Sequence, residues 1–206
     1  MTAKVVIVDY GLGNLASVKK SFSAAGAHAK ISSHPRDLSS ATHIVLPGQG
    51  AFGEGVENLE KRRLISALEE QVFKKKRPFL GICLGMQLLG KSSNEGGNHK
   101  GLGWLDGTVV KIAPNSSVRL PHIGGDDVTL SRPSSLTKEV KNGSDFYFAH
   151  SYILKLKRQN EVVARSSYGE IFPAIIELDN IRATLFHPEK SQDNGMRIIS
   201  NFLKSS

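Results

Sequence analysis

The sequence has little of what secreted, membrane or metal-binding proteins need. Its 206 residues contain one cysteine, so no internal disulfide can form and the fold does not depend on an oxidising compartment. No apolar stretch approaches the roughly 20 residues that span a bilayer, and the N-terminus lacks the charged start and long apolar run of a signal peptide. The seven histidines show no ligand spacing. We therefore expect a cytosolic protein with no membrane partner, no metal site and no cofactor.

Aromatic residues are also scarce, at 7%, which bears on the meaning of the net charge of +8. The densest basic runs, Lys61-Arg62-Arg63 and Lys74-Lys75-Lys76-Arg77, fall on an expected helix that also carries glutamates, with Phe73 as the one aromatic nearby. A nucleic-acid surface would interleave basic residues with aromatics on one face. We therefore expect no nucleic-acid partner, and interpret the runs as a solvated helix face or a docking patch for an acidic protein.

The order of apolar segments predicts an α/β fold. Short apolar strands separated by helices indicate a mostly parallel sheet with helices on both faces. The strands expected in this first part are residues 5–9, 29–31, 43–46 and 78–80, and the helices are 15–25 and 57–75. After residue 97 the pattern is rich in short strands, which predicts an antiparallel extension of the same sheet; we expect strands at 109–112, 128–130, 146–148, 162–164 and 174–176, turns at 115–117 and 142–144, and a helix at 196–203. At this length the chain is most simply one domain, residues 1–206.

The single cysteine stands in Gly81-Ile82-Cys83-Leu84-Gly85, between an apolar strand-like run and a helix-like run. A nucleophile between two glycines on a strand-to-helix turn is typical of hydrolase active sites, here with cysteine in place of serine. Glycines allow a tight turn and keep bulk away from the thiol, and the N-terminal end of the next helix favours the thiolate. The alternative is a buried structural cysteine in a tight turn, which these residues alone leave open.

A second motif, Phe186-His187-Pro188-Glu189, lies about a hundred residues further on. If the segment is extended, His187 and Glu189 point to the same side, so that Glu189 can accept a hydrogen bond from one ring nitrogen while the other takes the proton of Cys83. Nucleophile, base and orienting carboxylate are then in the order that catalytic triads require. A lone His-x-Glu is more often a solvated surface turn. Together with the cysteine turn, it favours a Cys83, His187 and Glu189 triad.

These motifs resemble the class I glutamine amidotransferases, whose flavodoxin-like fold and glutaminase activity the resemblance implies. Further segments are similar to one subfamily, the glutaminase subunits of imidazole glycerol phosphate synthase in histidine biosynthesis; they are Asp9-Tyr10-Gly11-Leu12-Gly13-Asn14-Leu15, Pro47-Gly48-Gln49-Gly50 and Tyr147-Phe148-Ala149-His150-Ser151-Tyr152. The likeness runs almost end to end. It implies hydrolysis of L-glutamine to glutamate and ammonia, and a heterodimer with a TIM-barrel cyclase that receives the ammonia.

The resemblance also implies roles for individual residues. Backbone N–H groups of Gly50 and Leu84 would form the oxyanion hole. Substrate glutamine would be held by Gln87, Glu95, His150, Ser151 and Tyr152. The ammonia exit and partner interface would include Asn14, His122, Gly125 and Lys190. Read without the family, Asn14 is a helix cap and Glu95 an ordinary loop charge.

Two positions depart from the family pattern. Related chains read Pro-His-x-Gly-Trp-Asn where this one has Pro121-His122-Ile123-Gly124-Gly125-Asp126, and Leu185 replaces a usual glutamine. A tryptophan at position 125 would anchor the interface and help to wall the ammonia path. The sequence therefore leaves open a paralogous glutaminase that supplies ammonia to an amidotransferase of surface sugars. A non-catalytic scaffold subunit is a third reading, which the complete triad disfavours.

Overall fold

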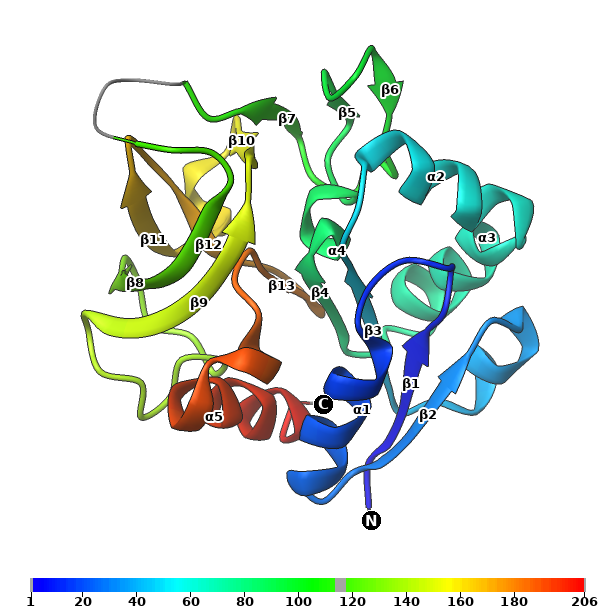
Figure 1. Ribbon diagram of the computed structural model, residues 1–206. Coiled ribbons are helices and arrows are strands. Elements are labelled where there is room, and N and C mark those ends of the chain that lie inside the picture. Colours follow the sequence, from blue (N-terminus) through cyan, green and yellow to red (C-terminus); the bar gives the residue numbers. More distant parts are fainter. Residues whose placement is uncertain (1, 114–117, 206) are drawn as a thin grey trace.

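The computed structural model of the protein describes residues 2–113 and 118–205, and in this part the chain forms two β-sheets covered by helices (Figure 1). The strands are β1 (Lys4–Val8), β2 (His28–Ser32), β3 (His43–Gly48), β4 (Phe79–Cys83), β5 (Ser92–Ser93), β6 (His99–Lys100), β7 (Gly107–Lys111), β8 (His122–Leu130), β9 (Ser144–His150), β10 (Tyr152–Leu156), β11 (Val162–Tyr168), β12 (Glu170–Leu178) and β13 (Ile181–Thr184). The α-helices are α1 (Leu15–Ala24), α2 (Phe52–Lys61), α3 (Leu64–Glu69), α4 (Leu84–Gln87) and α5 (Gln192–Leu203). Short helical turns are η1 (Pro35–Ser40), η2 (Glu70–Lys74), η3 (Gln159–Glu161) and η4 (Pro188–Lys190).

The larger sheet joins a parallel half to an antiparallel half. Its order is β2-β1-β3-β4-β13-β12-β11-β8-β9. The pairs from β2 to β13 are parallel, and those from β13 to β9 are antiparallel. Every residue of β3 and β4 is buried, as continuous apolar strands in a covered parallel sheet should be. The predicted α/β class with an antiparallel extension is confirmed.

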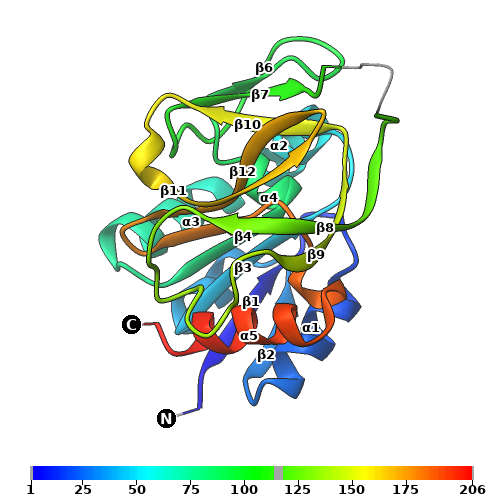
Figure 2. The same cartoon turned by 90° about the vertical axis from the view of Figure 1, so that its left-hand side faces the viewer.

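A second sheet, in the order β10-β7-β5-β6, was not expected (Figure 2). The segment predicted at 109–112 belongs here as β7, because it pairs with β10 instead of extending the central sheet. Gly107 permits this close pairing, since a Cβ there would lie 2.7 Å from the backbone oxygen of Lys155. Strand periodicity cannot tell which partner a strand takes. The turn expected at 115–117 lies outside the described residues, whereas that before β9 is present at Asn142 and Gly143.

The long helix expected at 57–75 is two helices. It starts earlier, at Phe52, and breaks where Arg63 adopts a left-handed backbone with φ of 55°. Hydrophobic spacing continues through the break, so the periodicity did not reveal it. Lys61 and Lys74 each pair with a glutamate one turn earlier, at 2.6 and 2.7 Å, which fits the interpretation of a solvated helix face.

Helices cover both faces of the larger sheet. Phe22 of α1 and Phe202 of α5 meet edge to face at 6.1 Å and bury one face, while α2 and α3 pack on the other (Figures 1 and 2). Within the described ranges, none of the helices combines the length and apolar character needed to cross a membrane.

The turn between β4 and α4 is the most tightly packed point of this arrangement. A Cβ on Gly85 would overlap the carbonyl oxygen of Leu46 in β3, and one on Gly81 would lie 2.8 Å from the carbonyl oxygen of Gly85. The two glycines thus make room for neighbouring backbone. This packing role is additional to the expected one of keeping bulk away from the thiol.

Substitution of Gly85 by alanine should therefore destabilise the protein by about 3 kcal/mol or more, because backbone must shift to relieve the overlap. Gly125→Ala is the matched control, since a Cβ there meets nothing within 4 Å. That control should change stability by less than about 0.5 kcal/mol. Urea denaturation of both variants measures the difference, and equal midpoints would contradict the packing argument.

Candidate active site

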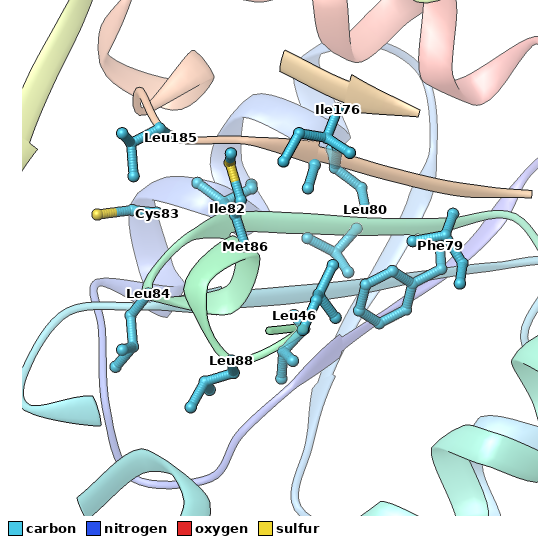
Figure 3. Packing of buried hydrophobic residues seen from close by; sticks show 14 of the residues in the cluster. Leu46, Phe79, Leu80, Ile82, Cys83, Leu84, Met86, Leu88, Ile176 and Leu185 are labelled. Atoms are coloured by element: carbon cyan, nitrogen blue, oxygen red, sulfur yellow. The ribbon is translucent and has the colours of Figure 1, made fainter. Parts of the chain in front are cut away.

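Cys83 occupies the turn between β4 and α4 in a backbone conformation that is rare for a non-glycine residue. Its φ is 54° and its ψ is −109°, and 4% of the residue is exposed. Such strain persists where the surrounding structure imposes it, commonly at functional sites. Figure 3 shows its sulfur pointing away from the apolar side chains of Phe79 and Leu80. The helix that follows, α4, is a single turn that begins at Leu84, directly after the cysteine.

His187 and Glu189 form a buried hydrogen-bonded pair. The Nδ1 atom of His187 lies 2.8 Å from Oε1 of Glu189, and each side chain is 3% exposed. The expected extended segment is only partly right: His187 is extended, but Pro188 begins the helical turn η4. This turn brings the carboxylate of Glu189 to Nδ1 of the imidazole ring. The pair is therefore made by a tight turn and not by the alternation of a strand.

The pair controls the charge of His187. Burial opposes protonation of the imidazole, but the neighbouring Cys83 and Glu189 outweigh burial and raise the pKa of His187 to about 9. In the described part of the chain, Nε2 of His187 is buried without a hydrogen-bond partner of normal geometry. The site thus combines a thiol, an imidazole that is protonated at neutral pH, and a carboxylate that fixes the ring.

Ser191 holds this turn in place, a role that the sequence did not indicate. Its Oγ donates to the carbonyl oxygen of His187 at 2.7 Å and accepts from the N–H of Tyr147 at 3.0 Å. The N–H of His187 in turn donates to the carbonyl oxygen of Tyr147 at 2.9 Å. The histidine is thereby fixed to β9. A serine four residues after a histidine carries no signal of this contact, because it depends on a strand distant in sequence.

A cavity of about 230 Å³ opens beside Cys83. It brings together the predicted oxyanion residues Gly50 and Leu84 and every predicted glutamine-binding residue; its lining is Gln49, Gly50, Cys83, Leu84, Gln87, Glu95, Pro121, Ala149, His150, Ser151 and Tyr152. A wider groove of about 620 Å³ lies alongside and shares Glu95. The smaller cavity is the candidate site because the strained cysteine lines it.

Two of the lining side chains also have structural partners. The Nε2 atom of Gln87 donates to the carbonyl oxygen of Tyr152 at 2.9 Å. Glu95 accepts a hydrogen bond at 2.8 Å from the N–H of Phe52, at the start of α2. Glu95 is therefore more than the ordinary loop charge that the sequence alone suggested, and its second oxygen remains available for a cationic ligand group.

The loop at Gly50 packs against the N-terminal glycine loop. Gly50 has φ of 136°, and a Cβ there would meet Leu12 at 3.2 Å. A Cβ on Gly13 would lie 3.1 Å from the Cα of Gly48. Tyr10 lies directly beneath Gly48, fully buried, and its hydroxyl has no hydrogen-bond partner among the described residues. No pattern in the sequence predicts that Tyr10 lies at this position.

The four predicted interface residues do not form one group. Gly125 and the exposed Lys190 line a common hollow of about 370 Å³, which also contains Tyr147. The ammonium group of Lys190 lies 5.4 Å from the Tyr147 ring centroid. Asn14 instead caps α1: its side-chain oxygen accepts a hydrogen bond from the N–H of Ser17 at 3.3 Å. This is the helix cap that the sequence predicts without the family resemblance. His122 is 2% exposed, so its side chain lies behind the surface and is no surface contact.

The second departure, Leu185, is fully buried. Its N–H donates to the carbonyl oxygen of Ala174, and its side chain lies near Cys83 in Figure 3. An apolar side chain suits this buried position, because the side-chain amide of a glutamine there would need hydrogen-bond partners of its own.

Comparison with known proteins agrees with this geometry. The family described as "Glutamine amidotransferase class-I" matches residues 6–205. "Imidazole glycerol phosphate synthase subunit HisH 1" of Campylobacter jejuni (strain RM1221) is 42% identical over 200 residues, covering 97% of this chain and 99% of the relative. "Imidazole glycerol phosphate synthase subunit HisH" of Aquifex aeolicus (strain VF5) is 42% identical over 204 residues, with 98% and 97% covered.

A solved structure shares the fold at low identity. The chain described as "Crystal structure of glutamine amidotransferase" superposes with a TM-score of 0.76 at 19% identity, covering 98% of this chain and 99% of that one. At this identity the likeness supports the architecture alone.

Replacing Cys83 by alanine should lower the pKa of His187 from about 9, because burial then opposes protonation with Glu189 as the main remaining support. The wild-type ring should be protonated at pH 7.5 and the variant ring largely neutral. NMR titration of ¹⁵N-histidine-labelled protein reads both states directly. An unchanged titration would show that Cys83 does not interact with the imidazole.

Proposed function

The chain belongs to the class-I glutamine amidotransferase family, and on that premise we propose that it is the glutaminase subunit of an imidazole glycerol phosphate synthase. The observation that carries the proposal is the 42% identity to named subunits of that synthase over nearly the full length of both chains. The geometry supports it independently, because the strained Cys83 lines a cavity suited to a small ligand and acts on the imidazole of the buried His187–Glu189 pair.

Cys83 is the proposed nucleophile. Its sulfur attacks the side-chain amide carbon of glutamine, and the carbonyl oxygen takes up negative charge. Backbone N–H groups of Leu84 and Gly50, which both line the cavity, are the proposed donors to this oxyanion. The raised pKa of His187, about 9, favours an imidazolium beside the sulfur at neutral pH. The catalytic proton is thus already on His187 when attack begins.

His187 then gives its proton to the departing nitrogen, so ammonia leaves and a thioester remains on Cys83. Water attacks the thioester while His187 accepts a proton from it, and glutamate is released with the thiolate restored. Glu189 keeps Nδ1 protonated throughout and directs Nε2 to the reacting atoms. The sum is glutamine and water to glutamate and ammonia.

The glutamine would be held at both ends. The carboxylate of Glu95 faces the cavity and suits the substrate ammonium group. Residues 150–152 line the opposite wall and would bind the carboxylate end, largely through backbone. Gln87, anchored on the carbonyl oxygen of Tyr152, links this wall to α4.

The ammonia acceptor is proposed to be a TIM-barrel cyclase, bound as a heterodimer in the cytoplasm. Its contact surface would include the loop of Asn14 and the hollow between Gly125 and Lys190. The first of these touches the oxyanion loop through Leu12 and Gly50. Binding of the partner at the Asn14 loop would therefore act on the proposed oxyanion donor at Gly50 through the contact with Leu12.

The missing tryptophan favours a second candidate for the partner. The hollow at Gly125 is unfilled by this chain, so the partner would need a bulky residue to occupy it. A paralogous glutaminase that supplies a sugar-modifying amidotransferase is the second candidate. A non-catalytic scaffold is disfavoured, since strain at Cys83 and a buried ion pair at His187 have no use in a scaffold.

With a histidine-pathway cyclase as partner, Cys83→Ala should abolish glutamine-dependent synthesis and leave synthesis from ammonium salts at the wild-type rate. The cyclase needs ammonia alone, and the chain has no other thiol. Product formation from each nitrogen source is the measurement. Turnover of glutamine by the variant would refute the nucleophile; failure of wild type to bind the cyclase would favour the sugar-modifying alternative.

Glutaminase activity of the isolated chain should be low and should rise strongly when the partner and its substrate bind. The reason is that Gly50, at φ of 136°, can reorient its peptide once the neighbouring Leu12 loop is contacted. Steady-state glutamate release from the free chain and from the complex measures this. Equal rates would show that the oxyanion donors are already aligned.

A further inference from the structure

Two buried histidines outside the triad stand side by side on adjacent strands. His122 of β8 is in register with His150 of β9, and Nδ1 of His122 lies 3.3 Å from Nε2 of His150. The outer end of the pair meets Asp126, whose Oδ2 lies 3.0 Å from Nε2 of His122. The inner end meets the carbonyl oxygen of Tyr152, 3.1 Å from Nδ1 of His150. We call Asp126, His122, His150 and this carbonyl the histidine line.

The histidine line is one proton short when both rings are neutral. It has three contacts, and each needs one hydrogen. Both ends, a carboxylate and a carbonyl oxygen, are acceptors, so every hydrogen must come from the rings. Two neutral imidazoles carry two N–H groups between them. All three contacts can be hydrogen bonds only when a third proton is bound.

Without the third proton, the contact at Tyr152 is the one that fails. The carboxylate of Asp126 is the strongest acceptor of the line and keeps the Nε2–H of His122. The Nδ1 atom of His122 then accepts from the Nε2–H of His150, because the alternative leaves both of these buried nitrogens without a donor, whereas the carbonyl oxygen of Tyr152 still accepts from Gln87. This leaves Nδ1 of His150 with a lone pair directed at the carbonyl oxygen of Tyr152.

That end of the line forms a wall of the candidate glutamine cavity. His150 and Tyr152 both line it, and the same carbonyl oxygen accepts from Gln87 at 2.9 Å. The opposite end, Asp126, has a side chain that is 36% exposed on β8, the strand that also carries Gly125. The line therefore runs from the surface near the Gly125 hollow to the substrate.

We propose that Asp126 and His122 are positioning residues for glutamine binding: the third proton completes the histidine line and fixes the wall formed by His150 and Tyr152. The identity of the ligand rests on the proposed glutaminase function. The substitution Asp126→Asn would change this dependence, because the amide N–H of the new side chain can donate to Nε2 of His122. The line is then complete with two neutral rings.

The groups around the line set the pH at which the proton leaves. Burial lowers the pKa of His122, although Asp126 opposes this effect. Burial, with His122 beside it, lowers the pKa of His150 to about 3, and His187 acts in the same direction. The third proton therefore belongs to the His122–Asp126 end.

Aromatic and acidic side chains of neighbouring elements also surround the histidine line. Tyr168 of β11 stacks on the His122 ring at 3.9 Å, and its hydroxyl is bound to the backbone of Arg119. Near Asp126, the pKa of Asp145 is raised by Asp127 and, more weakly, by Asp126. Because the pKa of His122 lies below its ordinary value, the line is complete on the acidic side of neutrality and loses a bond as the pH rises.

The first test reads the protons themselves on the full-length protein. In ¹⁵N-histidine NMR spectra at pH 8, wild-type His150 should carry its proton on Nε2, whereas in Asp126→Asn it should carry it on Nδ1. Asp127→Asn is the matched control, a neighbour on the same strand for which no hydrogen bond to His122 is observed, and it should behave as wild type. The same tautomer in wild type and Asp126→Asn would overturn the proposal.

The second test measures KM for glutamine in the complex with the cyclase partner from pH 5, below the ordinary histidine pKa, up to pH 8. One hydrogen bond corresponds to about a three- to tenfold change, so KM of wild type and Asp127→Asn should rise by that factor. KM of Asp126→Asn should stay flat. A parallel pH dependence in all three proteins would overturn the positioning role. Absence of any glutamine hydrolysis would refute the proposed function, while the NMR test would still decide the proton count.

Discussion

The close approach of β3 to the turn after β4 is the constraint on which the rest of the site depends. Backbone of Leu46 occupies the space where a side chain at Gly85 would stand, so the chain must turn sharply at Cys83. The cysteine takes a strained backbone and lines the candidate cavity, with its sulfur pointing away from Phe79 and Leu80 (Figure 3). The loop of Gly50, which carries a proposed oxyanion donor, continues directly from β3, so the same contact positions this loop relative to Cys83.

Three histidines, His187, His150 and His122, are all buried but differ in how readily they hold a proton. Burial disfavours the cation in each of them. At His187 the neighbours Cys83 and Glu189 reverse that effect. At His150 the nearest titratable neighbours are other histidines, so the ring stays neutral. His122 lies between these cases because its carboxylate, Asp126, is half exposed to solvent. The partner of each ring, and not its depth, decides its chemistry.

The sequence predicted the fold class well because apolar runs and glycines act locally. Strand and helix order in the first hundred residues follows from periodicity, and the nucleophile turn follows from Gly-x-Cys-x-Gly. It missed the helix break at Arg63 and the second sheet of β10, β7, β5 and β6. A single residue with a left-handed backbone does not interrupt the hydrophobic periodicity of a helix. Strand periodicity predicts that a segment is a strand but not which strand it pairs with.

For the site, the sequence by itself determined the residue types: one thiol, one His-Pro-Glu segment and the glycines around them. The tertiary structure decided how they meet. The one-turn helix at Pro188 brings Glu189 to Nδ1 of His187, Ser191 ties that turn to β9, and Tyr10 lies beneath Gly48. His122, expected at the partner interface and ammonia exit, is buried beside His150. These contacts join residues far apart in the chain, and their distances depend on the packing of whole strands, which no local pattern encodes.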